Sequence, residues 1–240
     1  MGGALVAGFV SGFAGFGTGL VASGFWFLAL PAPSVPPLIV CTSVVAQLMA
    51  LLRLRRSLDW RGVSPYLLGG ILGLPFGIMA LRVAAPSLLR VTVGVFLIAY
   101  ALVQLSAIRH WSVGRWGGRW ADTAVGCGGG FLGGFAGLSG PLPLIWLQLR
   151  GGPSAGQRMI YQPFNLVILA LAGIGMVMTG QIGGAVVTAA AGCLPLTILG
   201  TWIGLRLYSA AGEAVFKRIV LVLLMVSGGI LVAQSVAAPP

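Results

Sequence analysis

The chain has 240 residues, of which 58% are hydrophobic and only 7% carry a charge. Soluble domains carry roughly 25% charged residues, so this composition excludes a soluble globular protein. The formal net charge of +11 would point to a nucleic-acid partner if the protein were soluble. In a membrane protein, the same excess of Lys and Arg is typical of cytoplasmic loops. We therefore expect a lipid bilayer around the chain and no nucleic acid.

Eight apolar segments follow one another, with lengths that suit helices crossing a bilayer. They cover residues 2–31, 37–53, 62–82, 86–106, 121–149, 157–179, 182–205 and 214–236. Most of the seven tryptophans fall near segment ends, which is typical of interfacial belts. The first segment lacks the charged start and cleavage site of a signal peptide. The pattern predicts an all-α polytopic membrane protein with a single transmembrane domain over residues 1–240.

The two halves of the chain resemble each other. Residues 8–15 (GFVSGFAG) align with residues 130–137 (GFLGGFAG) at a shift of 122, and six of the eight positions are identical. This composition would give about one identity by chance. The similarity predicts two repeats of four segments, 1–106 and 121–240, joined by a polar loop at 107–120.

The first segment of each half is about 30 residues long, and each has a glycine cluster in its middle. A straight helix of that length would measure about 45 Å, against a hydrocarbon core of about 30 Å. A broken or re-entrant segment, two short half-helices that meet near the midplane, resolves the mismatch.

The distribution of basic residues favours re-entrant segments. If all eight segments cross the membrane, the 14 Lys and Arg residues divide seven to seven between the two sides. If the first segment of each half is re-entrant, Arg82 and Arg90 lie on one side and the other twelve on the opposite side. The second division is the one that the positive-inside rule predicts. We therefore predict six full crossings and two inverted repeats, a design common among transporters.

Titratable side chains give no sign of an enzyme. The acidic residues and the one histidine fall at segment ends or in the polar loop, at Asp59, Asp122, Glu213 and His110. Neither a carboxylate relay nor the buried nucleophile and base of a hydrolase is therefore expected. The cysteines lie apart without CxxC spacing, at Cys41, Cys127 and Cys193. We expect no catalytic residue, no metal and no cofactor.

The polar residues within the apolar segments are uncharged. Ser43 and Asn165 are equivalent under the shift of 122, and each is placed at the start of the segment that follows a glycine cluster. Hydroxyls, amides and bare backbone N–H groups can coordinate an oxyanion without a full countercharge. The predicted substrate site consists of Gly15, Gly17, Thr18, Gly19, Thr42, Ser43, Gln47, Gly137, Ser139, Gly140, Gln162 and Asn165. The alternative is that each side chain only bonds a neighbouring helix. Arg158 either guides an anion or extends to the headgroups.

Residues 8–19 (GFVSGFAGFGTG) and 130–140 (GFLGGFAGLSG) resemble the TauE/SafE family of membrane permeases, also called sulfite exporters. Each stretch is followed by a Pro-containing loop and a segment with small polar residues, and the resemblance covers essentially the whole chain. It implies movement of small sulfur-containing anions, such as sulfite or organosulfonates, across the bacterial inner membrane. The chain departs from the family at Thr18 and Ser139, where glycine is frequent, and at Phe164-Asn165, where Thr-Ser is more usual. These departures leave the identity of the anion open.

Three hypotheses follow. The first is a carrier that binds a small sulfur oxyanion or sulfonate between the two glycine clusters and works by alternating access. The second is an anion channel of the same architecture. The third is a non-transporting membrane subunit whose glycine-rich faces pack against a partner protein. A homo-oligomer is compatible with all three.

Overall fold

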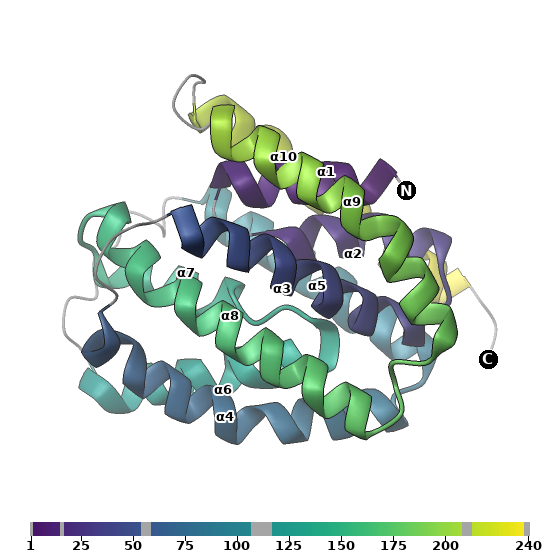
Figure 1. The fold of residues 1–240 in the computed structure, drawn as a ribbon, viewed down its shortest axis with the longest axis horizontal. Helices are drawn as coiled ribbons and strands as arrows, with labels where there is room; N and C mark the ends of the chain where they lie inside the picture. The colour runs from purple at the N-terminus through teal and green to yellow at the C-terminus, as the bar shows by residue number, and fades with distance from the viewer. Residues whose placement is uncertain (1, 15–16, 54–58, 107–116, 208–212, 238–240) are drawn as a thin grey trace.

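A computed structural model describes residues 2–14, 17–53, 59–106, 117–207 and 213–237, which are almost entirely helical (Figure 1). The elements are α1 (Gly2–Ala14), α2 (Thr18–Ala29), η1 (Ala32–Ser34), α3 (Val35–Arg53), α4 (Trp60–Val83), α5 (Pro86–Leu105), α6 (Gly118–Ala136), α7 (Pro141–Arg150), α8 (Ser154–Met178), α9 (Gly184–Leu207) and α10 (Glu213–Ala237). Helix α6 begins inside the stretch 107–120 that was predicted to be a polar loop. Residues 107–116 of that stretch lie outside the described part of the chain.

Six of the described helices are long and apolar enough to cross a membrane, namely α3, α4, α5, α8, α9 and α10. Prolines at the start of α3 are tolerated because the first turn of a helix needs no N–H donor there. Pro75 of α4 and Pro195 of α9 lie inside helices, as predicted. The all-helical, polytopic membrane fold is confirmed.

The first segment of each half is broken in two. Helices α1 and α2 form one hairpin, since the start of α1 lies beside the last part of α2. A Cβ atom added to Gly3 would lie 2.9 Å from the Cβ atom of Phe25. Helices α6 and α7 form the second, since the last residue of α7, Arg150, donates from Nη2 to the carbonyl oxygen of Gly118 at 2.6 Å. With 13, 12 and 10 residues, α1, α2 and α7 measure about 20 Å or less, too short to cross alone.

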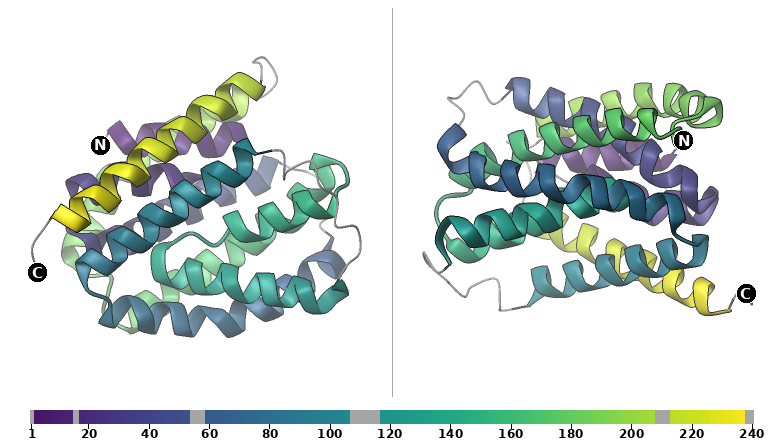
Figure 2. Two further views of the ribbon diagram at one scale, coloured as in Figure 1. Left: turned by 180° about the vertical axis from the view of Figure 1, so that it is seen from behind. Right: turned by 90° about the horizontal axis from the view of Figure 1, so that it is seen from below.

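The two hairpins open toward opposite ends of the molecule (Figures 1 and 2). Hairpin α6–α7 opens at the end where α4, α8 and α10 begin, which we call the arginine-rich end. Hairpin α1–α2 opens at the opposite end, where both chain termini lie (Figure 1). Arg82 and Arg90 are at this terminal end, by the end of α4 and the start of α5. The break of each hairpin is therefore enclosed between the two ends.

Glycine allows the tightest helix contacts. In the α4–α6 pair, a Cβ atom on Gly130 would overlap the carbonyl oxygen of Gly70, and the α1–α9 pair has the same relation between Gly8 and Thr197. Such close approach is typical of helix pairs in membranes, where van der Waals contact rather than the hydrophobic effect holds helices together. These two pairs frame the hairpins.

Candidate functional site

The break in the first hairpin lies at Gly17, whose φ of 98° is left-handed and suits glycine. Helix α2 starts at the next residue, and its first intrahelical bond runs from Val21 N to Gly17 O at 3.0 Å. The backbone N–H groups of Thr18, Gly19 and Leu20 therefore have no acceptor within the helix. Together they form a positive helix end at the break, worth about half an elementary charge.

The break in the second hairpin lies at Gly137, whose φ is 72°. Leu138 N bonds to Leu132 O at 3.1 Å and Gly137 N to Gly133 O at 3.0 Å, and these nested bonds close the end of α6. Helix α7 then begins at Pro141. Because Pro141 and Pro143 have no N–H, this helix end presents fewer backbone donors than the start of α2.

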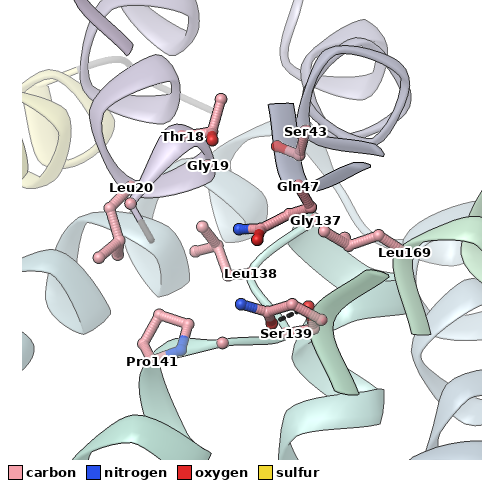
Figure 3. A pocket seen from close by; sticks show the side chains of 13 residues that line it. Thr18, Gly19, Leu20, Ser43, Gln47, Gly137, Leu138, Ser139, Pro141 and Leu169 are labelled. Carbon is pink, nitrogen blue, oxygen red and sulfur yellow. Dashed lines mark hydrogen bonds between the residues drawn. The ribbon is translucent and has the colours of Figure 1, made fainter. Parts of the chain in front are cut away.

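The two breaks meet at one narrow cavity of about 20 Å³, which has room for about one water molecule (Figure 3). A Cβ atom on Gly19 would lie 2.8 Å from the carbonyl oxygen of Gly137, so the hairpins touch through their backbones. The lining consists of Gly17, Thr18, Gly19, Leu20, Ser43, Gln47, Gly137, Leu138, Ser139, Gly140, Pro141, Asn165 and Leu169. Nine of these thirteen belong to the predicted substrate site, and they come from α2, α3, α8 and the two breaks.

Three polar side chains of the cavity have unsatisfied atoms. Thr18, Ser43 and Gln47 are 2%, 2% and 3% exposed, and Thr18 Oγ1, Ser43 Oγ and Gln47 Oε1 have no hydrogen-bond partner within the described part of the chain. Figure 3 shows all three pointing into the space between the helices. A buried polar atom without a partner costs about 1–3 kcal/mol, so the cavity is suited to a polar occupant.

Asn165 is oriented by the second break. Ser139 Oγ donates a hydrogen bond to Asn165 Oδ1 at 2.8 Å, and both side chains are buried. The bond occupies the carbonyl oxygen of the amide and leaves its Nδ2 amino group as a donor. A Cβ atom on Gly140 would overlap that amino group, so glycine is needed to make room for it.

Three residues predicted for substrate binding or anion guiding lie outside the lining of this cavity. Thr42 bonds back to its own helix, from Oγ1 to Leu38 O at 2.9 Å, and Gln162 is buried outside the lining. Arg158 lies at the arginine-rich end of α8, also outside the lining. Gly15 lies outside the described residues.

One detail of the prediction was wrong. Ser43 and Asn165 do not stand at the start of their helices but at the ninth residue of α3 and the twelfth of α8. The helices begin earlier because α3 accepts prolines in its first turn and α8 starts directly after Pro153. Both residues therefore lie in the middle part of their helices rather than in the first turn.

A second polar cluster, at the arginine-rich end, centres on Asp122 of α6. Its Oδ1 atom accepts from Tyr66 Oη at 2.6 Å and from Trp146 Nε1 at 2.8 Å, and its Oδ2 atom is 3.2 Å from Arg150 Nη1. Asp122 is 6% exposed. The sequence placed it at a segment end and Trp146 in an interfacial belt, and it gave no signal that these residues join α4, α6 and α7.

The sequence profile of a family described as sulfite exporter TauE/SafE matches residues 1–231 of the chain. The chain belongs to the TauE/SafE family. Membership in this transporter family confirms the predicted resemblance and implies a multi-pass membrane protein that transports sulfite-like or organosulfonate-like anions. No curated protein and no solved structure matches this TauE/SafE chain.

Proposed function

We propose that this TauE/SafE protein is a carrier that binds a small sulfur oxyanion or organosulfonate in the cavity between its two hairpin breaks. The supporting observation is the pair of buried hydroxyls of Thr18 and Ser43, which have no partner within the described residues and line one cavity. Two hydroxyls, the Asn165 amino group and the N–H groups at the start of α2 can all donate to an oxyanion. An occupant that accepts these bonds removes the cost of leaving the donors unpaired.

The proposed mechanism is alternating access by two inverted repeats within one transmembrane domain, 1–106 and 121–240. Reciprocal helix pairing supports it, because α1 packs on α9 as α6 packs on α4, and α3 packs on α9 as α8 packs on α4. Helix α5 also packs on α10, and α3 on α8, across the two halves. If the halves rock about these central contacts, the cavity opens first toward one hairpin mouth and then toward the other.

The proposed location is the bacterial inner membrane, with the arginine-rich end on the cytoplasmic side. Arg61, Arg119, Arg150, Arg158 and Arg206 belong to the ends of helices at this end. The positive-inside rule assigns such an end to the cytoplasm. The expected partners are then lipid and a small anionic solute, and the protein is a transporter rather than an enzyme.

The test is thermal unfolding of the purified protein with sulfite, thiosulfate, sulfate, a small sulfonate, phosphate and chloride at fixed ionic strength. A ligand that binds only the folded protein raises the unfolding temperature by mass action. We expect a selective rise with a sulfur anion, and its loss in Ser43→Ala and in Asn165→Ala.

Thr42→Val is the matched control. Thr42 is as buried as its neighbour Ser43, but its hydroxyl bonds to its own helix and lies outside the cavity. This variant should keep the anion effect. A folded protein whose stability responds to none of the anions would contradict the proposed site.

A further inference from the structure

The cavity is electrically neutral. Thirteen described residues line it, and their polar side chains are all uncharged and not titratable. These side chains are Thr18, Ser43, Gln47 and the hydrogen-bonded pair Ser139 and Asn165. The described titratable side chains of the helices around it all lie outside the lining: Cys41 of α3, Arg119, Asp122 and Cys127 of α6, Arg150 of α7, and Arg158 and Tyr161 of α8. Helix α2 has none. No full positive charge therefore stands opposite a bound anion.

The countercharge that the cavity does offer is fractional. The start of α2 contributes the equivalent of about +0.5 elementary charge. The start of α7 contributes less through hydrogen bonds, because its first and third residues are prolines. Neutral donors from Thr18, Ser43 and Asn165 complete the site.

Charge decides which form of a sulfur oxyanion such a site can hold. The cost of taking an ion out of water grows with the square of its charge, so a dianion costs about four times as much as a monoanion of the same size. Proteins usually meet a doubly charged oxyanion with Arg or Lys, which repay that cost by charge-assisted hydrogen bonds. Neutral hydrogen bonds and one helix end suit a single negative charge.

We infer that the cavity binds its substrate as a monoanion, taking bisulfite rather than the sulfite dianion, or a singly charged organosulfonate. The inference rests on the proposed function, since it assigns a charge state to the solute of that same site. It also assigns a consequence for transport. Sulfite that moves as bisulfite takes one proton with it, so a proton is carried across without any titratable side chain in the cavity.

The experiment compares a solute that titrates with one that does not. Binding of sulfite and of methanesulfonate to the purified protein is measured from about pH 6 to about pH 9 at fixed ionic strength. Methanesulfonate is a monoanion throughout, so its binding reports any change in the protein itself. We expect the dissociation constant for total sulfite to rise about tenfold per pH unit above the second ionisation of sulfite, as mass action requires. The constant for methanesulfonate should stay flat.

Sulfate supplies the reverse test, because it is a dianion over the whole range. It should bind at least tenfold more weakly than methanesulfonate to the unaltered protein. In Gln47→Lys, which adds a positive charge to the lining, sulfate should gain relative to methanesulfonate. Thr42→Val, outside the lining, should leave both the pH profile and the order of anions unchanged.

The outcomes separate the two proposals. Sulfite binding that stays flat or tightens with pH while methanesulfonate binds, or sulfate binding as tightly as methanesulfonate, would overturn the monoanion inference and leave the anion site standing. Absence of binding by every anion at every pH, in folded protein, would overturn the proposed function and the inference together.

Discussion

The Asp122 cluster should be a main source of stability at the arginine-rich end, and Asp122→Ala measures it. The substitution removes three contacts from one carboxylate, to Tyr66, Trp146 and Arg150. Hydrogen bonds within membranes contribute about 0.6 kcal/mol on average and at most about 1.7 kcal/mol, so the three give about 2–5 kcal/mol. Because Asp122 is 6% exposed and forms an ion pair with Arg150, we expect a value in the upper part of this range. The free energy of unfolding should fall by about 3–5 kcal/mol. The assay is reversible unfolding in mixed micelles.

Asp59→Asn is the matched control for the lost charge. Asp59 is exposed and caps α4 by accepting from Gly62 N at 3.0 Å, and asparagine caps a helix about as well as aspartate. This control should change the unfolding free energy by less than about 0.5 kcal/mol.

A double substitution completes the test. Arg150→Met alone leaves Asp122 buried without its cation, whereas Asp122→Ala with Arg150→Met removes both charges. The double variant should therefore lose less stability than the two single losses summed. If Asp122→Ala matched Asp59→Asn, or if the losses added, the cluster would not be the coupled network that its geometry indicates.

Three further predictions concern packing, topology and entry. Gly130→Ala should destabilise the protein by about 3 kcal/mol because the new methyl group overlaps the Gly70 carbonyl, while Gly229→Ala, with open space around it, should cost nothing measurable in the same unfolding assay. Ala85 and Ser154 are both exposed, so each can be replaced by cysteine in a cysteine-free background. Ala85→Cys and Ser154→Cys should react with an impermeant thiol reagent from opposite sides of the membrane. Labelling from the same side would refute the hairpin topology. Arg158→Gln should slow anion uptake at low ionic strength and have no effect at high ionic strength, where charge steering is screened, so an equal loss at both would contradict a guiding role.

The sequence was sufficient to predict the helical membrane fold because the signal is summed over many residues. Runs of apolar residues indicate spans whatever the packing partner, and the six long helices appear close to the predicted segments. The breaks were predictable for a different reason. A 30-residue apolar segment with glycines at its centre conflicts with the thickness of the bilayer, and the chain bends at Gly17 and Gly137.

The site was predictable only as a set of residue types. Nine predicted residues surround one cavity, but Thr42 and Gln162 have the same character and lie outside it. Whether a threonine side chain points into a cavity depends on the rotation of its helix about the helix axis. Neighbouring residues of an α-helix differ in direction by about 100°. Their function as a substrate site stays a prediction.

The Asp122 cluster shows what one-dimensional patterns cannot supply. Its members are separated by up to 84 positions, from Tyr66 to Arg150, and nothing in their spacing indicates contact. The sequence placed Asp122 near the end of a segment. In the fold, that end of α6 lies against α4 and α7. Burial there depends on tertiary packing, and the sequence around Asp122 does not encode it locally.

The two hairpins also differ in what they contribute to the cavity, even though their sequences are similar. The first supplies backbone N–H groups at the start of α2, where Thr18 and Gly19 leave the helix end open. The second begins α7 with a proline and supplies the Ser139 hydroxyl, which orients Asn165 of α8, in place of backbone donors. Among the described residues, an ion pair joins the two helices of the second hairpin only, between Asp122 of α6 and Arg150 of α7. If the protein alternates access as proposed, an opening that moved α6 away from α7 would have to break the Asp122–Arg150 ion pair, and no described ion pair imposes that cost on α1 and α2.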